Sequence, residues 1–219
     1  LAGLYAQGCT EVREPETSRD HTERMLRAFG VNVETGPGVA ALNGGQRLIG
    51  TRIPVPADIS SAAFFLLAAA IVPGSELLLQ DVGINPTRTG VVDILRQMGA
   101  VIEMLNPRTF GGEPVCDLRV RGQALRGIRI EPGQVASAID EFPAIFIAAA
   151  CAQGETRVTG AEELRVKESD RIAAMVDGLC RLGIEALATP DGAIIQGGRI
   201  GGAEIESHGD HRIAMAFAM

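Results

Sequence analysis

Apolar and polar positions follow one plan that occurs three times along the chain. In each copy an apolar, Ala-rich helix ends at glycine, a short strand and a polar loop follow, and an amphipathic helix leads through glycine into another strand. The apolar stretches lie at 1–7, 62–73 and 143–153, and a further one begins after Asp210. The repeat predicts an α/β protein of β-α-β-α-β-β units, with apolar helices buried inside and sheets packed around them.

The ends of these helices are marked by residue type. Glycine tolerates the left-handed conformation that closes a helix, and such glycines recur at Gly8, Gly30, Gly74, Gly99, Gly154 and Gly183. An aspartate precedes three apolar helices, which predicts N-caps at Asp58, Asp140 and Asp210. Asp20 and Glu23 have the spacing of a capping box.

A domain boundary is predicted near Thr51–Pro56, where TRIPVPAD places two prolines around Val55 after a glycine-rich stretch. The prolines stiffen a crossover, and ligand clefts often lie between domains. A loop within one domain is the alternative. Both chain ends resemble interrupted apolar helices without caps, and we therefore expect a fragment of a longer protein.

Composition narrows the classes of protein. A hydrophobic fraction of 46% and a charged fraction of 21% are ordinary for a globular protein, and a net charge of −7 disfavours a general nucleic-acid binder. The longest apolar run, 62–72, is about half of the ~20 residues that span a bilayer. Four dispersed cysteines lack zinc-finger spacing and favour reduced thiols in the cytoplasm.

The densest polar cluster is RVKESDR, residues 165–171, at a loop-to-helix junction where Ser169 or Asp170 can cap the helix. Glu168 and Lys167 are spaced to share a face with Arg171. Lys167 is the only lysine, against 19 arginines, which hints at a role for a small mobile ammonium. A solvated charged cap explains the same spacing.

Other helix starts suit anions, because free N–H groups and arginine forks favour carboxylate or phosphate. SHGDHR, residues 207–212, holds two histidines but no third metal ligand, so no metal site is expected. Thr17, Ser18 and Arg19 can reach one phosphate. Asp140 is a candidate carboxylate or merely a cap, and the segment 86–90 around Arg88 has no nearby carboxylate in sequence and is taken as capping.

At these residues the sequence resembles the 5-enolpyruvylshikimate-3-phosphate synthase family. EPETSRDHTERMLRAFGV, PVPADISSAAFFLLAAAIVPGSEL, NPTRTGVVDILRQMGA, EELRVKESDRIAAM and SHGDHRIAMAFAM resemble its blocks in order and cover nearly the whole chain. The resemblance implies an inside-out α/β barrel in two domains, with 1–52 the end of the first and 53–219 most of the second. It implies transfer of the enolpyruvyl group from phosphoenolpyruvate to the shikimate-3-phosphate 5-hydroxyl, without metal or organic cofactor.

The resemblance also implies roles. Asp140 matches a base near the 5-hydroxyl, Glu168 a proton donor to the methylene carbon, and Lys167 a contact to the shikimate substrate. The remaining matches are Arg171 and Arg212 with His211 beside them at phosphoenolpyruvate, and Ser18 with Arg19 at the 3-phosphate. The family's earlier lysine, serine, arginines and glycine-rich loop, and a later lysine, have no counterpart here, so we expect the chain alone to be inactive.

Two other functions stay open at this stage. A UDP-N-acetylglucosamine enolpyruvyl transferase shares the expected fold, and a non-catalytic scaffold would use the same clusters as caps. The expected partners are the two small-molecule substrates, with neither nucleic acid nor membrane. The parent protein is expected to be a monomer, whereas exposed apolar faces of a fragment invite self-association.

Overall fold

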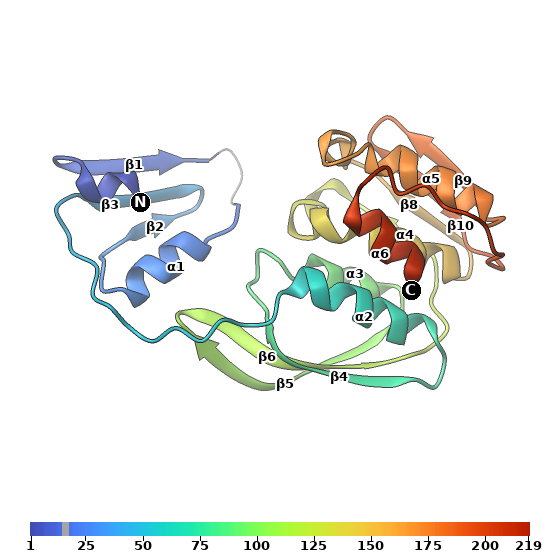
Figure 1. Ribbon diagram of the computed structural model, residues 1–219, viewed down its shortest axis with the longest axis horizontal. Coiled ribbons are helices and arrows are strands. Elements are labelled where there is room, and N and C mark those ends of the chain that lie inside the picture. Colours follow the sequence, from blue (N-terminus) through green and yellow to red (C-terminus); the bar gives the residue numbers. More distant parts are fainter. Residues whose placement is uncertain (15–17) are drawn as a thin grey trace.

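The first 50 residues form a small α/β body with its own apolar cluster. The computed structural model describes residues 1–14 and 18–219, so Thr17 lies outside the described residues. A 3-10 helix at Ala2–Tyr5 stands where the sequence predicted the end of an α-helix. Strands β1 (Cys9–Arg13), β2 (Glu34–Gly36) and β3 (Val39–Asn43) form an antiparallel sheet in the order β1-β3-β2, and α1 (His21–Ala28) packs beside it (Figure 1).

The second body begins with a helix, a strand, a helix and a hairpin. Helices α2 (Ile59–Ile71) and α3 (Gly90–Gln97) cover an antiparallel sheet with the order β4-β6-β5. Its strands are β4 (Glu76–Gly83), β5 (Val101–Phe110) and β6 (Glu113–Arg121). The plan repeats with α4 (Phe142–Cys151), α5 (Arg171–Arg181) and strands β7 (Arg129–Ile130), β8 (Glu155–Val158), β9 (Glu185–Thr189) and β10 (Gly192–Gln196), in the sheet order β7-β8-β10-β9.

The apolar helices lie inside, as the sequence predicted. Figure 1 shows α2, α3, α4 and α6 (His211–Ala218) between the two larger sheets. Helix α4 contacts α2, α3, α5, α6 and β10, and every residue from Phe142 to Ala150 is buried. A helix that is apolar all round is stable only when it is surrounded in this way. The alanines at 148–150 let neighbouring backbones approach closely.

The predicted helix ends are largely confirmed. The six glycines expected to close helices have φ between 82° and 107°. Asp58 accepts hydrogen bonds from the N–H groups of Ser60 and Ser61, and Asp210 accepts one from Arg212, as N-caps do.

Two capping predictions are wrong. Asp140 does not cap α4, because the 3-10 helix η3 (Ala136–Glu141) runs directly into α4 and leaves the Asp140 carboxylate for other partners. Asp20 stands at the N-cap of α1 but makes no capping bond, since its carboxylate binds the side chains of Arg24 and Asn85. No capping box forms at this helix.

A polar network joins the two bodies beside the connecting segment. The amide of the buried Asn85 donates to Asp20 Oδ1 at 2.6 Å and to Glu113 Oε2 at 3.0 Å. Glu113 Oε1 lies 2.8 Å from His21 Nδ1, and Arg24 donates to the carbonyl of Gly112. These contacts connect the start of α1 to the β5–β6 hairpin.

The side of the β4-β6-β5 sheet that faces away from the helices carries a second polar cluster. At this point the pairing register shifts in both edge strands, β4 and β5. Asp81 and Asn106 have φ of 56° and 51°, a conformation that non-glycine residues adopt rarely. The buried carboxylate of Asp117 accepts from the Asp81 N–H at 3.0 Å, the Asn106 amide at 2.9 Å and the Arg108 guanidinium at 2.6 Å. One carboxylate thus holds two bulges in register.

Among residues 1–14 and 18–219, no helix combines the length and apolar character required to cross a lipid bilayer.

A methyl group at Gly90 is expected to displace η3. A Cβ there would lie 2.4 Å from Ser137 Oγ, 2.8 Å from the Ser137 carbonyl carbon and 2.9 Å from Ala138 Cβ. Overpacking of this kind costs about 1–3 kcal/mol, so Gly90→Ala should lower the free energy of unfolding by that amount in urea titrations. Gly133→Ala is the matched control, because a Cβ at that nearby glycine meets nothing within 4 Å. Equal stability of the two variants would contradict the packing argument.

Candidate functional site

A buried ion pair joins the beginnings of α5 and α6. The Arg171 side chain is 1% exposed and that of Asp210 is 0% exposed. Arg171 Nε donates to Asp210 Oδ2 at 2.8 Å, and Ser169 Oγ donates to the same oxygen at 3.1 Å. A buried charge is tolerated only when it is paired and hydrogen-bonded, so this contact fixes both helix starts together.

Local capping explains why these residues meet. Asp170 accepts the N–H of Ala173 and begins α5, and Asp210 Oδ1 accepts the N–H of Arg212 at 2.9 Å and begins α6. Asp210 therefore caps α6 with Oδ1 and pairs with Arg171 through both oxygens, because Arg171 Nη2 also donates to Oδ1 at 3.4 Å. The sequence predicted its cap but not its pairing with Arg171.

Glu168 extends from the buried guanidinium toward solvent. Arg171 Nη2 donates to Glu168 Oε2 at 2.5 Å, and the Glu168 side chain is 55% exposed. The three-residue spacing that predicted this contact is confirmed. The carboxylate is thus held at one end by a fixed cation and stays accessible to water.

Asp140 lies among four cations from three parts of the chain. Its Oδ2 is 2.5 Å from Arg19 Nη2 and 4.0 Å from Arg212 Nη2, and its Oδ1 is 3.8 Å from Arg171 Nη1 and 3.9 Å from Lys167 Nζ. Burial raises the pKa of Asp140, but the hydrogen bond from Arg19 and the charges of Arg212, Arg19 and Lys167 outweigh it, so the pKa lies below its usual value.

One nitrogen of the Arg171 guanidinium makes no hydrogen bond to the described residues. Among the described residues, its buried Nη1 has no hydrogen-bond partner, and Asp140 Oδ1 at 3.8 Å is too distant to be one. An unpaired buried donor costs about 1–3 kcal/mol. Arg171 Nη1 is therefore available to donate a hydrogen bond to the oxygen of a ligand.

An open cleft of about 680 Å³ adjoins Asp140. Its lining includes Ser18, Arg19, Asp140 and Lys167 among the predicted site residues, together with Glu163. Glu163 Oε1 lies 2.5 Å from Lys167 Nζ, a contact that holds the ammonium at the cleft wall. Glu168, Arg171 and Arg212 belong to the same side-chain cluster through Asp140 but do not line this cleft.

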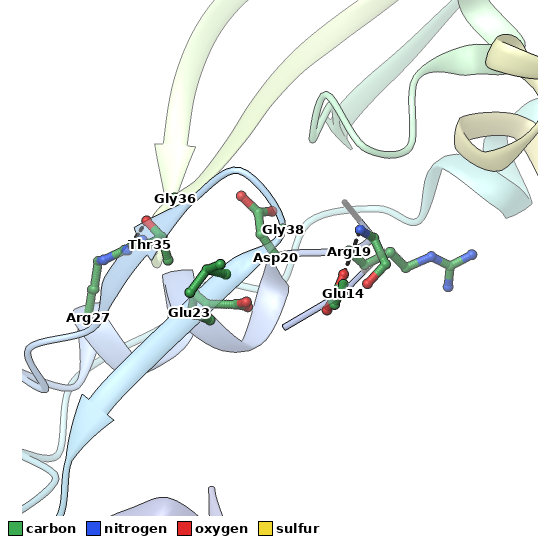
Figure 2. A pocket seen from close by; sticks show the side chains of 11 residues that line it. Glu14, Arg19, Asp20, Glu23, Arg27, Thr35, Gly36 and Gly38 are labelled. Carbon is green, nitrogen blue, oxygen red and sulfur yellow. Dashed lines mark hydrogen bonds between the residues drawn. The ribbon is translucent and has the colours of Figure 1, made fainter. Parts of the chain in front are cut away.

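Ser18 and Arg19 also border a smaller pocket of about 190 Å³ in the first body. Ser18 N–H donates to Glu14 Oε2 at 2.8 Å, and Arg27 donates to Thr35 Oγ1 at 2.8 Å (Figure 2). Figure 2 shows the Arg19 guanidinium extending away from the other lining side chains. Its partner is Asp140, so Arg19 is the direct ionic contact between the first body and the candidate site.

His211 is set apart from the other predicted residues. It is the exposed first residue of α6, and no hydrogen bond of its ring is present in the described part of the chain. Its neighbour Arg212 is directed inward and donates to the Asp140 carbonyl oxygen at 3.0 Å.

Three residues that lie next to the candidate site were not predicted from the sequence: Ser60, Arg88 and Glu141. Glu141 is buried behind Asp140 and accepts a hydrogen bond from Ser60 Oγ at 2.5 Å. Arg88, for which no carboxylate was expected, lies 3.4 Å from Asp58 Oδ1 and 3.8 Å from Glu141 Oε1, which corrects the interpretation as a simple cap. These contacts join residues 30 to 81 positions apart, and no local pattern signals them.

Within the described stretches 1–14 and 18–219, no group of three or more His, Cys, Asp or Glu side chains is arranged to hold a metal ion.

Known proteins with this sequence pattern identify the family. The profile of EPSP synthase (3-phosphoshikimate 1-carboxyvinyltransferase) matches residues 1–219. The chain belongs to the EPSP synthase family. It is 64% identical over 219 residues to the 3-phosphoshikimate 1-carboxyvinyltransferases of Methylococcus capsulatus and Xanthomonas euvesicatoria, covering all of this chain and 50% of each relative.

Solved structures of EPSP synthase agree with the fold. A structure from Acinetobacter baumannii has 57% sequence identity and a TM-score of 0.95, covering 99% of this chain and 51% of that chain. A second structure from the same organism has 55% identity and a TM-score of 0.94. The chain thus spans about half the length of the EPSP synthases that it matches.

Loss of the Asp210 charge should strongly destabilise the protein. Removing one partner of a buried ion pair costs about 3–5 kcal/mol, so Asp210→Asn should reduce the free energy of unfolding by that order at neutral pH. Asp177→Asn, which breaks an exposed pair with Arg181, is the control and should cost less than about 1 kcal/mol. A similarly small effect at position 210 would contradict the role assigned to the pair.

The Arg171–Asp210 pair also predicts that the protein becomes less stable at acid pH. Burial raises the pKa of Asp210, but the hydrogen bonds from Arg171, the Arg212 N–H and Ser169 outweigh it, so the pKa lies below its ordinary value. The folded state therefore prefers the ionised form, and this stabilisation is complete above the unfolded value and is lost as the pH falls through the lowered pKa. Thermal unfolding between pH 5 and pH 2 should show a smaller decline for Asp210→Asn than for the unaltered protein.

Proposed function

We propose that this chain is part of a 3-phosphoshikimate 1-carboxyvinyltransferase, which transfers the enolpyruvyl group of phosphoenolpyruvate to the 5-hydroxyl of shikimate-3-phosphate. One observation carries the proposal: Arg19, Lys167, Arg171 and Arg212 converge on Asp140, with Glu168 held on Arg171. Two polyanionic substrates need such a concentration of cations, and addition to a double bond needs a base and an acid. Membership of the EPSP synthase family supports the substrate choice.

Each of the two proton transfers in the addition step uses a different carboxyl group, Asp140 as the base and Glu168 as the acid. The 5-hydroxyl oxygen bonds to C2 of phosphoenolpyruvate and its proton goes to Asp140, while C3 takes a proton from Glu168 in its protonated form. In the tetrahedral intermediate the Glu168 carboxylate takes a proton back from C3 and the C2–O bond to phosphate breaks, which restores the double bond. The leaving phosphate takes the proton held by Asp140, so both carboxyl groups return to their starting states. The exposure of Glu168 permits exchange of its proton with solvent.

The cations divide between the two substrates. Arg171 and Arg212, with His211 beside them, bind phosphoenolpyruvate, and Lys167 contacts the shikimate ring. The unpaired Nη1 of Arg171 supports this assignment, because a substrate oxygen supplies its missing acceptor. Ser18 and Arg19 bind the 3-phosphate. As the phosphate draws Arg19 from Asp140, the carboxylate loses its shortest cationic contact and becomes a stronger base.

The domain assignment is part of the same proposal. Residues 1–52 belong to the first domain of the enzyme and residues 53–219 to the second, and the substrates bind where these meet. Two separate apolar clusters support the division, one around Leu4, Leu26, Val31 and Val33 and the other throughout the second body. The cytoplasm is the proposed compartment, because the four cysteines form no disulfide.

The test is substrate-dependent phosphate release by a full-length protein containing this sequence. Phosphate should appear only when phosphoenolpyruvate and shikimate-3-phosphate are both present. Release with UDP-N-acetylglucosamine in place of shikimate-3-phosphate would overturn the substrate assignment. The 219-residue chain alone should give no turnover, because it spans half the length of its relatives.

Neutral analogues of the two carboxylates should separate chemistry from binding. Asp140→Asn and Glu168→Gln in the full-length protein should each lower kcat by about 10²–10⁴-fold, the usual contribution of a general acid or base. Glu162→Gln, an exposed carboxylate six positions before Glu168, is the matched control and should keep wild-type kcat. Unchanged turnover in Glu168→Gln would make that residue a structural cap.

A further inference from the structure

The carboxylate of Glu141 is buried beside the proposed base yet has no part in the proton transfers. Its side chain is 2% exposed, and Oε1 accepts a hydrogen bond from Ser60 Oγ at 2.5 Å. The same oxygen lies 3.8 Å from Arg88 Nη2 and 4.0 Å from Arg212 Nη1. One buried negative charge therefore stands between two guanidinium groups.

These contacts gather three helix starts around Glu141. Ser60 is in the first turn of α2, Arg88 lies two residues before the first residue of α3, and Arg212 is in the first turn of α6. Arg88 Nη2 also donates to Ser60 Oγ at 2.5 Å, so the hydroxyl links the second guanidinium to the carboxylate. The arrangement connects elements far apart in the chain through a single side chain.

Arg212 is placed between the two acidic neighbours by this charge. Its Nη1 donates to the Asp140 carbonyl oxygen at 3.0 Å and faces Glu141 Oε1, while its Nη2 is 4.0 Å from Asp140 Oδ2. Without a negative charge at position 141, the attraction toward the Asp140 carboxylate would be unopposed. The guanidinium would then move onto the proposed base and away from the substrate.

We propose that Glu141 is a positioning residue, which holds Arg212 in its phosphoenolpyruvate-binding place and off the carboxylate of Asp140. This inference rests on the proposed function for the role of Arg212. Burial and the neighbouring Asp140 charge raise the pKa of Glu141 overall, while the Ser60 hydroxyl and the charges of Arg88 and Arg212 oppose that rise.

The experiment compares Glu141→Gln with the full-length wild-type protein in steady-state kinetics. The glutamine keeps the shape and can accept from Ser60, but it removes the charge. The KM for phosphoenolpyruvate should rise about tenfold, because the displaced arginine no longer binds the substrate. The kcat should also fall, because the same arginine then lies on the carboxylate of Asp140 and weakens it as a base. Ser60→Ala, which leaves the carboxylate but removes its hydrogen-bond donor, should change KM in the same direction.

A double-mutant cycle tests whether Glu141 acts through Arg212. In an Arg212→Ala background, Glu141→Gln should change the KM for phosphoenolpyruvate less than about twofold, because coupled residues are not additive. Asp117→Asn is the matched control, a buried carboxylate paired with an arginine on the outer side of the β4-β6-β5 sheet. It should lower stability and leave KM for phosphoenolpyruvate unchanged.

The outcomes separate this inference from the proposed function. Absence of phosphate release by the wild-type protein would reject the enzyme assignment, whatever position 141 does. Crystal structures of wild-type and Glu141→Gln proteins test the positioning independently of turnover. Retention of the Arg212 contact with the Asp140 carbonyl in the variant, or an unchanged KM in active protein, would overturn the proposal.

Discussion

The burial of Arg171 is the constraint on which the candidate site depends. A guanidinium that is 1% exposed needs a countercharge, and Asp210, itself fully buried, supplies it from the start of another helix. Once that pair forms, the starts of α5 and α6 are fixed relative to each other, and Glu168 and Arg212 are fixed with them. The positions of the charged groups around Asp140 thus follow from the need to pair the buried guanidinium of Arg171 with a carboxylate.

Helix starts supply nearly every polar group of this cluster. Asp140 and Glu141 precede α4, the segment 168–170 precedes α5, and Asp210 precedes α6. The apolar interiors of these helices pack against one another, so their polar beginnings converge at one end of the core. Helix N-termini favour anions through their free N–H groups, which adds to the attraction of the arginines.

Much of this architecture could be predicted from the chain alone. The period of the apolar stretches, the closing glycines and the caps at Asp58 and Asp210 are local signals, and each determines a local structure. Asp140 was ambiguous because its sequence context matches that of a cap. Only the 3-10 helix leading into α4 frees its carboxylate, and that helix gives no distinct sequence signal.

The long-range pairs were beyond such analysis. Arg19 meets Asp140 across 121 positions, and Ser60 meets Glu141 across 81. Which of 19 arginines reaches which carboxylate depends on how the helices pack, and charge patterns along the sequence do not contain that information. The resemblance to a family supplied the relevant residues, but it did not supply Glu141 or Arg88.

The single lysine allows the cleft to be labelled selectively, because Lys167 lies at its wall. Lys167 is the only ε-amine among 219 residues, and its side chain is partly exposed at the cleft wall between Glu163 and Asp140. Reagents that acylate amines but spare guanidinium groups therefore have one side-chain target in this sequence. A label attached to Lys167 reports on the cleft, because the arginines elsewhere on the surface do not react with such reagents.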